Sequence, residues 1–413
     1  MAGKRNRPAA LLDDVRGGVR LVIDGVAGVT GMVEAMHGRI ARRAPPLGFV
    51  ADAPTTGITG LVYRSVRATT GLVGRSLDAA LAGVQSMLQA SLRTVPQEQA
   101  GPLRDAVVAA LNGVLGDHLE RTGNPLAIPL ELRSRSRGTE TGGHVLLLIH
   151  GLCMNDLQWM RGGHDHGQAL AALGYTPLYL RYNSGRHVSA NGHDLAVALE
   201  EAIRQWPVPV ESIAIVGHSM GGLVARSAMH QAAQAGMAWP QRVRTLVFLG
   251  TPHHGAPLER GGNWLHRGLG ISPYVAPFTR LSGLRSEGIT DLRHGNLLEQ
   301  DWKGGRFESR DARAAVPLPH GVHCYAIAGT LGPAQDDGSP DVPRPSAGAR
   351  ALAAAWLGDG LVPVASALGR HARRTRDLHI PPSHQWIAHG VDHLDLLASQ
   401  AVFERLRRWL SLR

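Results

Sequence analysis

The stretch Gly217-His218-Ser219-Met220-Gly221-Gly222 decides the fold. A β-branched, apolar run at residues 213–216 precedes it, and a helix-like segment at residues 223–235 follows. In a chain with 51 glycines the motif alone is weak, but this context predicts a strand, a tight turn and a helix. Small residues beside Ser219 allow the sharp turn that exposes its hydroxyl. The helix N-terminus behind it favours developing negative charge.

The composition limits the class of protein. The 413 residues are 44% hydrophobic, which is enough for one large domain with an appendage, or for two domains. The two cysteines, Cys153 and Cys324, exclude a disulfide framework and favour a reducing compartment. No apolar run is long enough to span a bilayer, and no secretory signal is evident. We therefore expect a cytoplasmic protein.

The charge balance favours anionic partners. The net charge is +10, and the basic residues are scattered rather than grouped in blocks. No nucleic-acid-binding motif accompanies them, and aromatic residues make up only 5% of the chain, which leaves little for base stacking. We expect no nucleic-acid partner, and the charge has two interpretations: attraction to anionic surfaces, or solubility.

Residues 1–122 are predicted to form a helical N-terminal region. Apolar residues recur at helical spacing in residues 11–43 and 60–92, and a third helix fits residues 97–119. Glycines within these helices permit flat docking on a lipid surface, or close packing on the main domain. Both interpretations stay open, so peripheral membrane association through these helices is one expected interaction.

Residues 123–413 alternate between strands and helices. This pattern predicts an α/β fold with a mostly parallel sheet, helices on both faces, and ligands at the carboxyl ends of the strands. An apolar insertion at residues 256–321 is expected to cap the site. Helices are expected at residues 194–205 and 394–410. The expected strands lie at residues 128–133, 144–150, 176–182, 212–216, 243–249, 324–328 and 378–380.

A serine nucleophile needs a base and a group that orients the base. Asp359 lies in a glycine turn after the strand near Cys324, and His393 precedes the last helix. Chain order and spacing favour this pair without excluding others. The other candidates are Asp336, Asp337 and Asp341 for the acid, and His371, His379, His384 and His389 for the base.

From about residue 144 to the C-terminus, the sequence resembles the α/β-hydrolase superfamily, specifically bacterial triacylglycerol lipases and related esterases. The resemblance implies that Ser219, Asp359 and His393 form a catalytic triad, and that the backbone N–H groups of Leu152 and Met220 form an oxyanion hole. The segments that carry it are Leu148-Ile149-His150-Gly151-Leu152, Gly217 to Gly222 as quoted above, Leu249-Gly250-Thr251-Pro252-His253-His254-Gly255, Asp359-Gly360-Leu361-Val362 and His393-Leu394-Asp395.

Two departures from those lipases are informative. Asp395 matches one ligand of the calcium ion that many of them bind, but Ser399 stands where a glutamine ligand is expected. Ala365 stands where secreted members often carry a cysteine. We therefore expect no metal and no other cofactor. The resemblance assigns no proton transfer to His150 or His218, and we expect structural roles for both.

The sequence thus predicts a serine carboxylester hydrolase that cleaves a hydrophobic ester, which is consistent with a role in lipid metabolism. An acyltransferase that uses the same triad is one alternative, and a non-catalytic protein that binds lipid surfaces is another. We expect hydrolysis of soluble esters to survive removal of the residues before about Leu126, provided that the truncated protein folds.

Overall fold

The computed structural model describes residues 17, 18, 20, 102–135, 141–256, 286–303, 311, 313–332 and 358–412. Contacts divide the chain into two compact units, of which one comprises Met1–Gly101 with Leu119–Ala127 and the other Pro102–His118 with Ile128–Arg413. The sheet and the candidate site lie in the second unit. None of the helices in the described ranges combines the length and the apolar character needed to cross a membrane.

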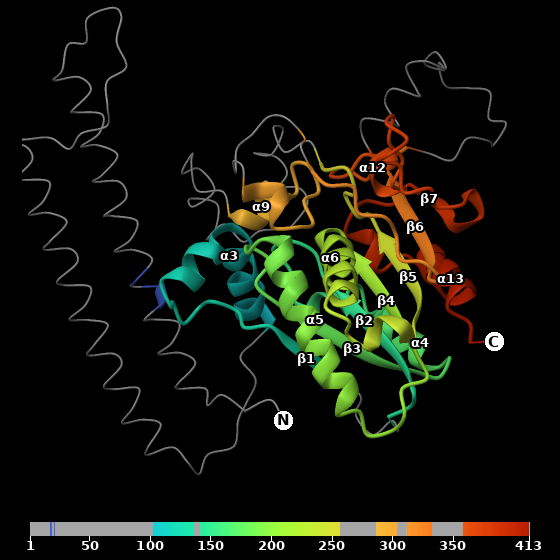
Figure 1. Ribbon diagram of the computed structural model, residues 1–413, viewed down its shortest axis with the longest axis horizontal. Helices are drawn as coiled ribbons and strands as arrows, with labels where there is room; N and C mark the ends of the chain where they lie inside the picture. Colours follow the sequence, from blue (N-terminus) through green and yellow to red (C-terminus); the bar gives the residue numbers. More distant parts are fainter. Residues whose placement is uncertain are drawn as a thin grey trace, which may run out of the picture. The chain divides into compact units, whose positions relative to one another are not determined.

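A seven-stranded sheet with the order β1-β3-β2-β4-β5-β6-β7 forms the centre of the second unit (Figure 1). All neighbouring strands are parallel except β1 and β3, which pair antiparallel at one edge. The strands are β1 (Glu131–Ser134), β2 (His144–Ile149), β3 (Tyr175–Arg181), β4 (Ser212–His218), β5 (Val243–Leu249), β6 (His323–Thr330) and β7 (Gln385–His389).

The helices cover both faces of this sheet. On one face, α5 and α6 pack together and α6 contacts β2, β4 and β5 (Figure 1). On the other face, apolar residues of α4 and α13 join those of β2, β4 and β5 in one buried cluster. The helices are α3 (Pro102–Arg121), α4 (His166–Ala171), α5 (Val188–Arg204), α6 (Met220–Gln234), α9 (Glu287–Asp291), α10 (Gln300–Lys303), α12 (Val364–Ala367) and α13 (Gln400–Trp409). Short 3-10 turns are η1 (Asp156–Trp159), η2 (Trp239–Arg242), η4 (Pro382–His384) and η5 (Asp395–Leu397).

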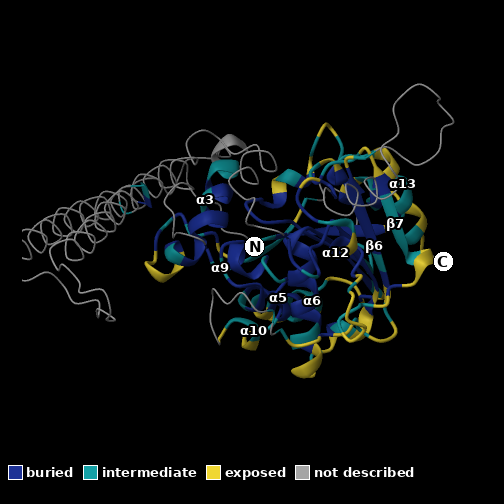
Figure 2. Cartoon of the chain, turned by 90° about the horizontal axis from the view of Figure 1, so that it is seen from above, coloured by how far each residue is buried: buried dark blue, intermediate teal, exposed yellow. Residues whose placement is uncertain are grey.

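Burial on both faces explains the apolar strands that made the fold predictable. Strand β2 is buried along residues 145–149, and β4 and β5 are buried along nearly their whole length. Figure 2 shows buried residues gathered in the interior, near α6 and β6, and exposed residues toward the outside. A strand covered on both sides needs apolar residues at every position, whereas a half-exposed strand alternates. The predicted α/β fold with a mostly parallel sheet is therefore confirmed, and six of the predicted strands overlap with β1 to β6.

The last strand was placed wrongly by the sequence. Residues 378–380 form no strand, and β7 instead spans Gln385–His389, where it pairs with β6. His379 has φ 50°, a left-handed conformation that extended backbone excludes, and two prolines follow at residues 381 and 382. The final helix α13 also begins later than predicted, because η5 intervenes.

Several predicted features fall outside the described residues. These are the helices at residues 11–43 and 60–92 and most of the cap insertion at residues 256–321. The third predicted helix corresponds to α3. The division of the chain at residue 122 stays a prediction, although Pro102–His118 belongs by its contacts to the same unit as the sheet.

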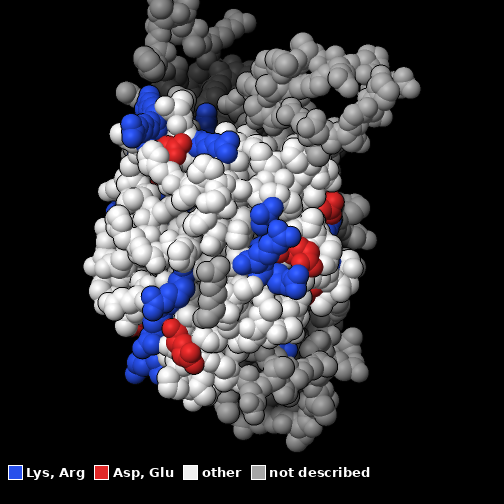
Figure 3. All heavy atoms as spheres, turned by 90° about the vertical axis from the view of Figure 1, so that its right-hand side faces the viewer, with Lys and Arg blue, Asp and Glu red and all other residues white. Residues whose placement is uncertain are grey.

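On the face shown in Figure 3, basic side chains stand beside acidic ones and are separated by uncharged surface. They form no continuous basic patch over the described residues in this view.

Candidate active site

The serine elbow lies at the carboxyl end of β4. Ser219 joins β4 to α6 with φ 55° and ψ −125°, a backbone conformation that residues other than glycine rarely adopt. Such a conformation costs on the order of 1–3 kcal/mol and persists only where surrounding contacts hold it. Here the Ser219 N–H donates to the Leu249 carbonyl at 2.8 Å, at the end of β5.

The elbow requires glycine at positions 221 and 222, because neighbouring parts of the chain approach its backbone too closely for a Cβ atom. A Cβ on Gly221 would lie 2.2 Å from the carbonyl oxygen of Ile149, and a Cβ on Gly222 would lie 2.0 Å from Thr251 Oγ1. The first turn of α6 therefore packs against the ends of β2 and β5 with no room for a side chain. The predicted strand, turn and helix around Ser219 are confirmed.

Asp359 and His393 are 34 residues apart in the chain and meet in a buried pair. His393 Nδ1 lies 2.6 Å from Asp359 Oδ2, and the two residues are 5% and 2% exposed. The other carboxylate oxygen, Oδ1, accepts the N–H groups of Leu361 at 3.0 Å and Val362 at 2.8 Å. A carboxylate so held accepts a hydrogen bond from the Nδ1–H group, and this selects the imidazole tautomer in which Nε2 is free to accept a proton.

The His393 ring lies beside the elbow. Its centroid is 4.8 Å from that of His218, the residue before Ser219, and His218 Nε2 lies 2.9 Å from the His393 carbonyl. The segment at Gly250 contacts both residues. A Cβ on Gly250 would lie 3.1 Å from His393 Cε1, and the carbonyl of the preceding residue, Leu249, accepts the Ser219 N–H. The hydrogen bonds among the described residues include none between Ser219 Oγ and His393. Catalytic hydrogen bonds often tighten only when substrate binds.

Two backbone N–H groups are available next to Ser219. Met220 is the first residue of α6, so its N–H has no acceptor within the helix. Leu152 lies in the loop after β2, and a Cβ on Gly151 in this loop would lie 2.9 Å from the Ser219 Cβ. Neither N–H group has a backbone acceptor in the described part of the chain. The structure thus places the loop that carries Leu152 beside Ser219, while Met220 directly follows the serine.

The loop at residues 151–155, which we call the oxyanion loop, is held by polar contacts at both ends. The carbonyl of His150 accepts the Tyr182 hydroxyl at 2.8 Å, and the Cys153 N–H donates to Ser184 Oγ at 3.0 Å. Cys153 has φ 59°, so the loop, like the elbow, contains a strained residue. Asn155 ends the loop as the N-cap of η1, and its Nδ2 donates to the Asp105 carbonyl of α3 at 3.0 Å.

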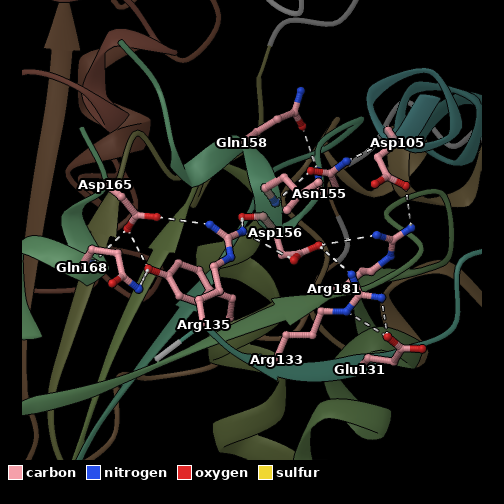
Figure 4. A network of polar contacts seen from close by, with 12 residues as sticks. Asp105, Glu131, Arg133, Arg135, Asn155, Asp156, Gln158, Asp165, Gln168 and Arg181 are labelled. Carbon is pink, nitrogen blue, oxygen red and sulfur yellow. Dashed lines mark hydrogen bonds and ion pairs between the residues drawn. The ribbon is translucent and has the colours of Figure 1, made fainter. Parts of the chain in front are cut away.

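A charged network anchors η1 directly after this loop (Figure 4). The carboxylate of Asp156, only 1% exposed as a residue, lies among the guanidinium groups of Arg133, Arg135 and Arg181 at 3.5–3.7 Å. Arg181 also lies 3.5 Å from Asp105 of α3. Buried ion pairs contribute little net stability but fix one arrangement of their partners. The network therefore fixes α3, β1, β3 and the oxyanion loop relative to one another.

Helix α3 packs directly on this part of the site. A Cβ on Gly113 would lie 2.1 Å from Cys153 Sγ, and one on Gly116 would lie 1.8 Å from Asn183 Oδ1. Asn183 Nδ2 donates to the Gly116 carbonyl at 2.9 Å. This role of α3 was not predicted from the sequence, although two glycines three residues apart in one helix are a signal of close packing. The contacts argue against the expectation that residues before Leu126 are dispensable for hydrolysis.

The rival candidates are placed elsewhere or lie outside the described residues. Asp336, Asp337 and Asp341 are not described. His371 contacts His254, His379 pairs with Asp377, His384 packs on Tyr325, and His389 is exposed on β7. Among the described histidines, His393 is the one bonded to Asp359.

Part of the cap insertion is described. Gly288 at the start of α9 donates its N–H to the Gly185 carbonyl at 3.0 Å, and a Cβ there would lie 2.9 Å from Met220 Cε. Asp291 at the end of α9 accepts the N–H of Val188, the first residue of α5, at 2.8 Å. This carboxylate lies at the N-terminus of a 17-residue helix, where negative charge is favourable.

No group of His, Cys, Asp or Glu in the described ranges has a metal-binding arrangement. Asp395, which matches a family calcium ligand, lies 3.7 Å from the guanidinium of Arg161. The absence of a metal or cofactor stays a prediction.

Residues 140–305 match a family model described as PGAP1-like alpha/beta domain. Comparison with curated proteins gave no match. Among solved structures, the mature lipase BlEst2 of Bacillus licheniformis is 17% identical and aligns with 69% of this chain and 98% of its own, with a TM-score of 0.42. A lipase-esterase related protein from Clostridium acetobutylicum is 13% identical over 68% of this chain and 99% of its own, with a TM-score of 0.37. A soluble variant of monoglyceride lipase from Saccharomyces cerevisiae is 13% identical over 68% and 91%, with a TM-score of 0.37.

The strand order with one antiparallel edge strand and the serine elbow after a central strand define an α/β-hydrolase fold. The predicted α/β-hydrolase fold is thus confirmed, and the matched domain at residues 140–305 falls within the same part of the chain.

Four histidines of this unit are buried and uncharged at neutral pH. Burial lowers the pKa of His150 and of His166 to about 4, and it lowers the pKa of His218 and His253 well below the usual value of 6.5. His150 also stacks on Tyr182, with ring centroids 4.3 Å apart. These side chains serve as packing and hydrogen-bonding groups, in line with the structural roles expected for His150 and His218.

Gly113→Ala tests the packing of α3 on the oxyanion loop. Helix propensity alone predicts a gain in stability of about 1 kcal/mol. Because the new Cβ would lie 2.1 Å from Cys153 Sγ and 2.7 Å from its Cα, we expect a loss of roughly 1–3 kcal/mol instead, measured by denaturant unfolding.

The control is the double variant Gly113→Ala, Cys153→Gly. Glycine at position 153 removes the clashing sulfur and tolerates the positive φ, so it should recover much of the loss in a double-mutant cycle. A stability gain in Gly113→Ala alone would contradict the proposed packing.

Acid should destabilise the protein over the range from about pH 6.5 to about pH 4. In this window the unfolded chain binds protons at histidines that stay neutral when folded, so lower pH favours unfolding. Each such histidine contributes about 1.4 kcal/mol per pH unit. The free energy of unfolding of wild type and His166→Asn, measured between about pH 8 and pH 5, should show a shallower decline in the variant. If the free energy of unfolding fell equally with pH in both proteins, His166 would not contribute to the destabilisation by acid.

Proposed function

We propose that this protein is a serine carboxylester hydrolase that cleaves a hydrophobic ester through Ser219, His393 and Asp359. The observation that carries the proposal is the buried 2.6 Å contact of His393 with Asp359, beside a strained serine at the end of β4. A buried carboxylate that fixes one imidazole tautomer beside a strained serine serves the activation of a hydroxyl and has no evident use in packing alone.

In the first step, Ser219 Oγ attacks the ester carbonyl carbon while His393 Nε2 accepts the hydroxyl proton. Asp359 keeps the Nδ1 proton in place and stabilises the imidazolium that forms. Because Asp359 Oδ1 is held by two backbone N–H groups, the carboxylate cannot easily rotate away from the ring.

The negative charge that develops on the carbonyl oxygen would be met by the N–H groups of Leu152 and Met220. The N-terminus of α6 adds a favourable dipole at the same point. Loss of one such donor typically slows an acyl-transfer enzyme by about a hundredfold or more. The rigid support of the oxyanion loop by α3 and the Asp156 network would keep these donors in position.

The proton on His393 then passes to the leaving alcohol, whose bond to the acyl carbon breaks and leaves an acyl-Ser219 ester. Water attacks this ester, with His393 again accepting a proton, and the carboxylic acid is released. The apolar character of the acyl group is supported by the cap residues near Met220, where Ile289 and Leu292 of the α9 segment are buried.

Contact of the N-terminal helices with a lipid surface and a cytoplasmic location remain proposals. The segments that would make such a contact, at residues 11–43 and 60–92, lie almost entirely outside the described ranges.

Ser219→Ala should abolish the release of p-nitrophenol from acyl esters of graded chain length. Loss of the nucleophile removes the acyl-enzyme route, so we expect kcat to fall by roughly a thousandfold or more. Ser212→Ala, at the opposite end of β4, serves as the matched control and should retain activity. Hydrolysis that persists in a folded Ser219→Ala protein would refute the proposal.

A further inference from the structure

A cavity of about 210 Å³ that is lined in part by charged and imidazole side chains lies away from Ser219 in the same unit. It is bounded by α6, by the loop after β5, and by three later segments of the chain. Its charged and imidazole side chains come from Arg226, Arg313, Arg374 and Arg376, from Asp301 and Asp377, and from His253, His254 and His379.

Arg226 projects from α6 and is only 6% exposed. Its Nη2 donates to the Val316 carbonyl at 2.6 Å, while its Nε is buried without an acceptor. No described carboxylate forms an ion pair with it. Burial, followed by the charge of Arg313, lowers the pKa of Arg226 to about 9. A buried cation without a partner is costly, and a bound anion would offset that cost.

His253 supplies a second unused donor. Its Nδ1 lies 3.3 Å from Arg226 Nη1, which can only donate, so Nδ1 accepts. Burial, and next the charge of Arg226, lowers the pKa of His253 well below its usual value, so the ring is neutral and carries its proton on Nε2. That N–H is fully buried and has no acceptor among the described residues.

The acidic residues of the cavity are already engaged. Asp301 accepts the N–H groups of Leu297, Leu298 and Ala314, and Asp377 accepts those of His371 and His379. Asp311, just outside the cavity lining, pairs with Arg313 and Arg376. Two buried donors, Arg226 Nε and His253 Nε2, therefore remain unsatisfied on residues that line this cavity, while its carboxylates are engaged.

We propose that this cavity is an anion-binding pocket that takes a phosphate group, with Arg226 Nε and His253 Nε2 as its buried donors. A tetrahedral oxyanion presents acceptors in several directions and forms charge-assisted hydrogen bonds with guanidinium groups. The exposed Arg374 lines the same cavity and adds positive charge. The group is either free phosphate or the phosphate of a larger ligand.

To place its headgroup in the pocket, an ester bound at Ser219 would have to reach from the elbow to Arg226. Arg226 lies seven residues after Ser219 on the helix that begins at Met220, a rise of about 10 Å along its axis. The headgroup case rests on the proposed ester hydrolysis, whereas binding of free phosphate does not.

The first experiment measures binding without catalysis. Thermal unfolding of the full chain is followed in increasing inorganic phosphate and in chloride at matched ionic strength. We expect phosphate to raise the unfolding midpoint of the wild type, because a ligand that binds the folded state stabilises it. Arg226→Met should abolish this rise, and Arg204→Met, an exposed arginine on α5, should preserve it.

His253→Leu provides a second variant if Arg226→Met does not fold. Loss of one donor to a charged ligand should weaken phosphate binding by about tenfold or more. No phosphate-specific rise in the wild type, or an equal rise in Arg226→Met, overturns the proposal and leaves a water-filled cavity.

The second experiment identifies the source of the phosphate. Hydrolysis of dibutyrylglycerol 3-phosphate is compared with that of dibutyrylglycerol in wild type and Arg226→Met. A selective fall in kcat/KM for the phosphorylated ester assigns the pocket to a substrate headgroup. An unchanged ratio, with the phosphate-dependent stabilisation lost, assigns it to free phosphate. Because the first experiment needs no turnover, failure of the ester hydrolase proposal would leave its result intact.

Discussion

The backbone of Ser219 is the constraint on which the rest of the site depends. Ser219 adopts φ 55° at the junction of β4 and α6, although it is not a glycine. At this junction the helix and the sheet approach too closely for a side chain at Gly221 or Gly222. The strain is tolerated because the N–H of Ser219 is bonded to β5 and the first turn of α6 packs against β2 and β5. The same geometry directs the N–H of Met220 and the end of the α6 dipole toward one point. The fold thereby creates an electropositive position beside a hydroxyl.

The partners of that serine are supported by separate parts of the chain. The turn at residues 358–362 holds the Asp359 carboxylate, and the histidine that it orients follows β7. The oxyanion loop depends on α3 and on the Asp156 network, which tie helix, sheet and loop together (Figure 4). In such an arrangement, substitutions far from the reacting atoms change activity by shifting donors by fractions of an ångström.

The sequence predicted those elements of the fold that follow from local patterns, namely runs of apolar residues and clustered glycines. Apolar runs located β2, β4 and β5 because these strands are buried on both faces, and glycines around Ser219 located the elbow because backbone contacts demand them. The pairing of His393 with Asp359 agrees with the position expected from the resemblance. By contrast, the last strand was wrongly predicted at residues 378–380, because the residue types there do not reveal the left-handed φ of His379. The roles of α3 and Arg226 were missed because each depends on neighbours that are distant in the chain, such as Cys153 and His253.

The central claim is that His393, oriented by Asp359, activates Ser219. The most direct measurement is covalent trapping with a p-nitrophenyl alkylphosphonate, followed by mass spectrometry of the intact protein and its peptides. We expect one adduct per chain on Ser219, formed much more slowly in folded His393→Gln and Asp359→Asn proteins. Modification at another residue, or labelling of Ser219 at the wild-type rate without His393, would contradict it.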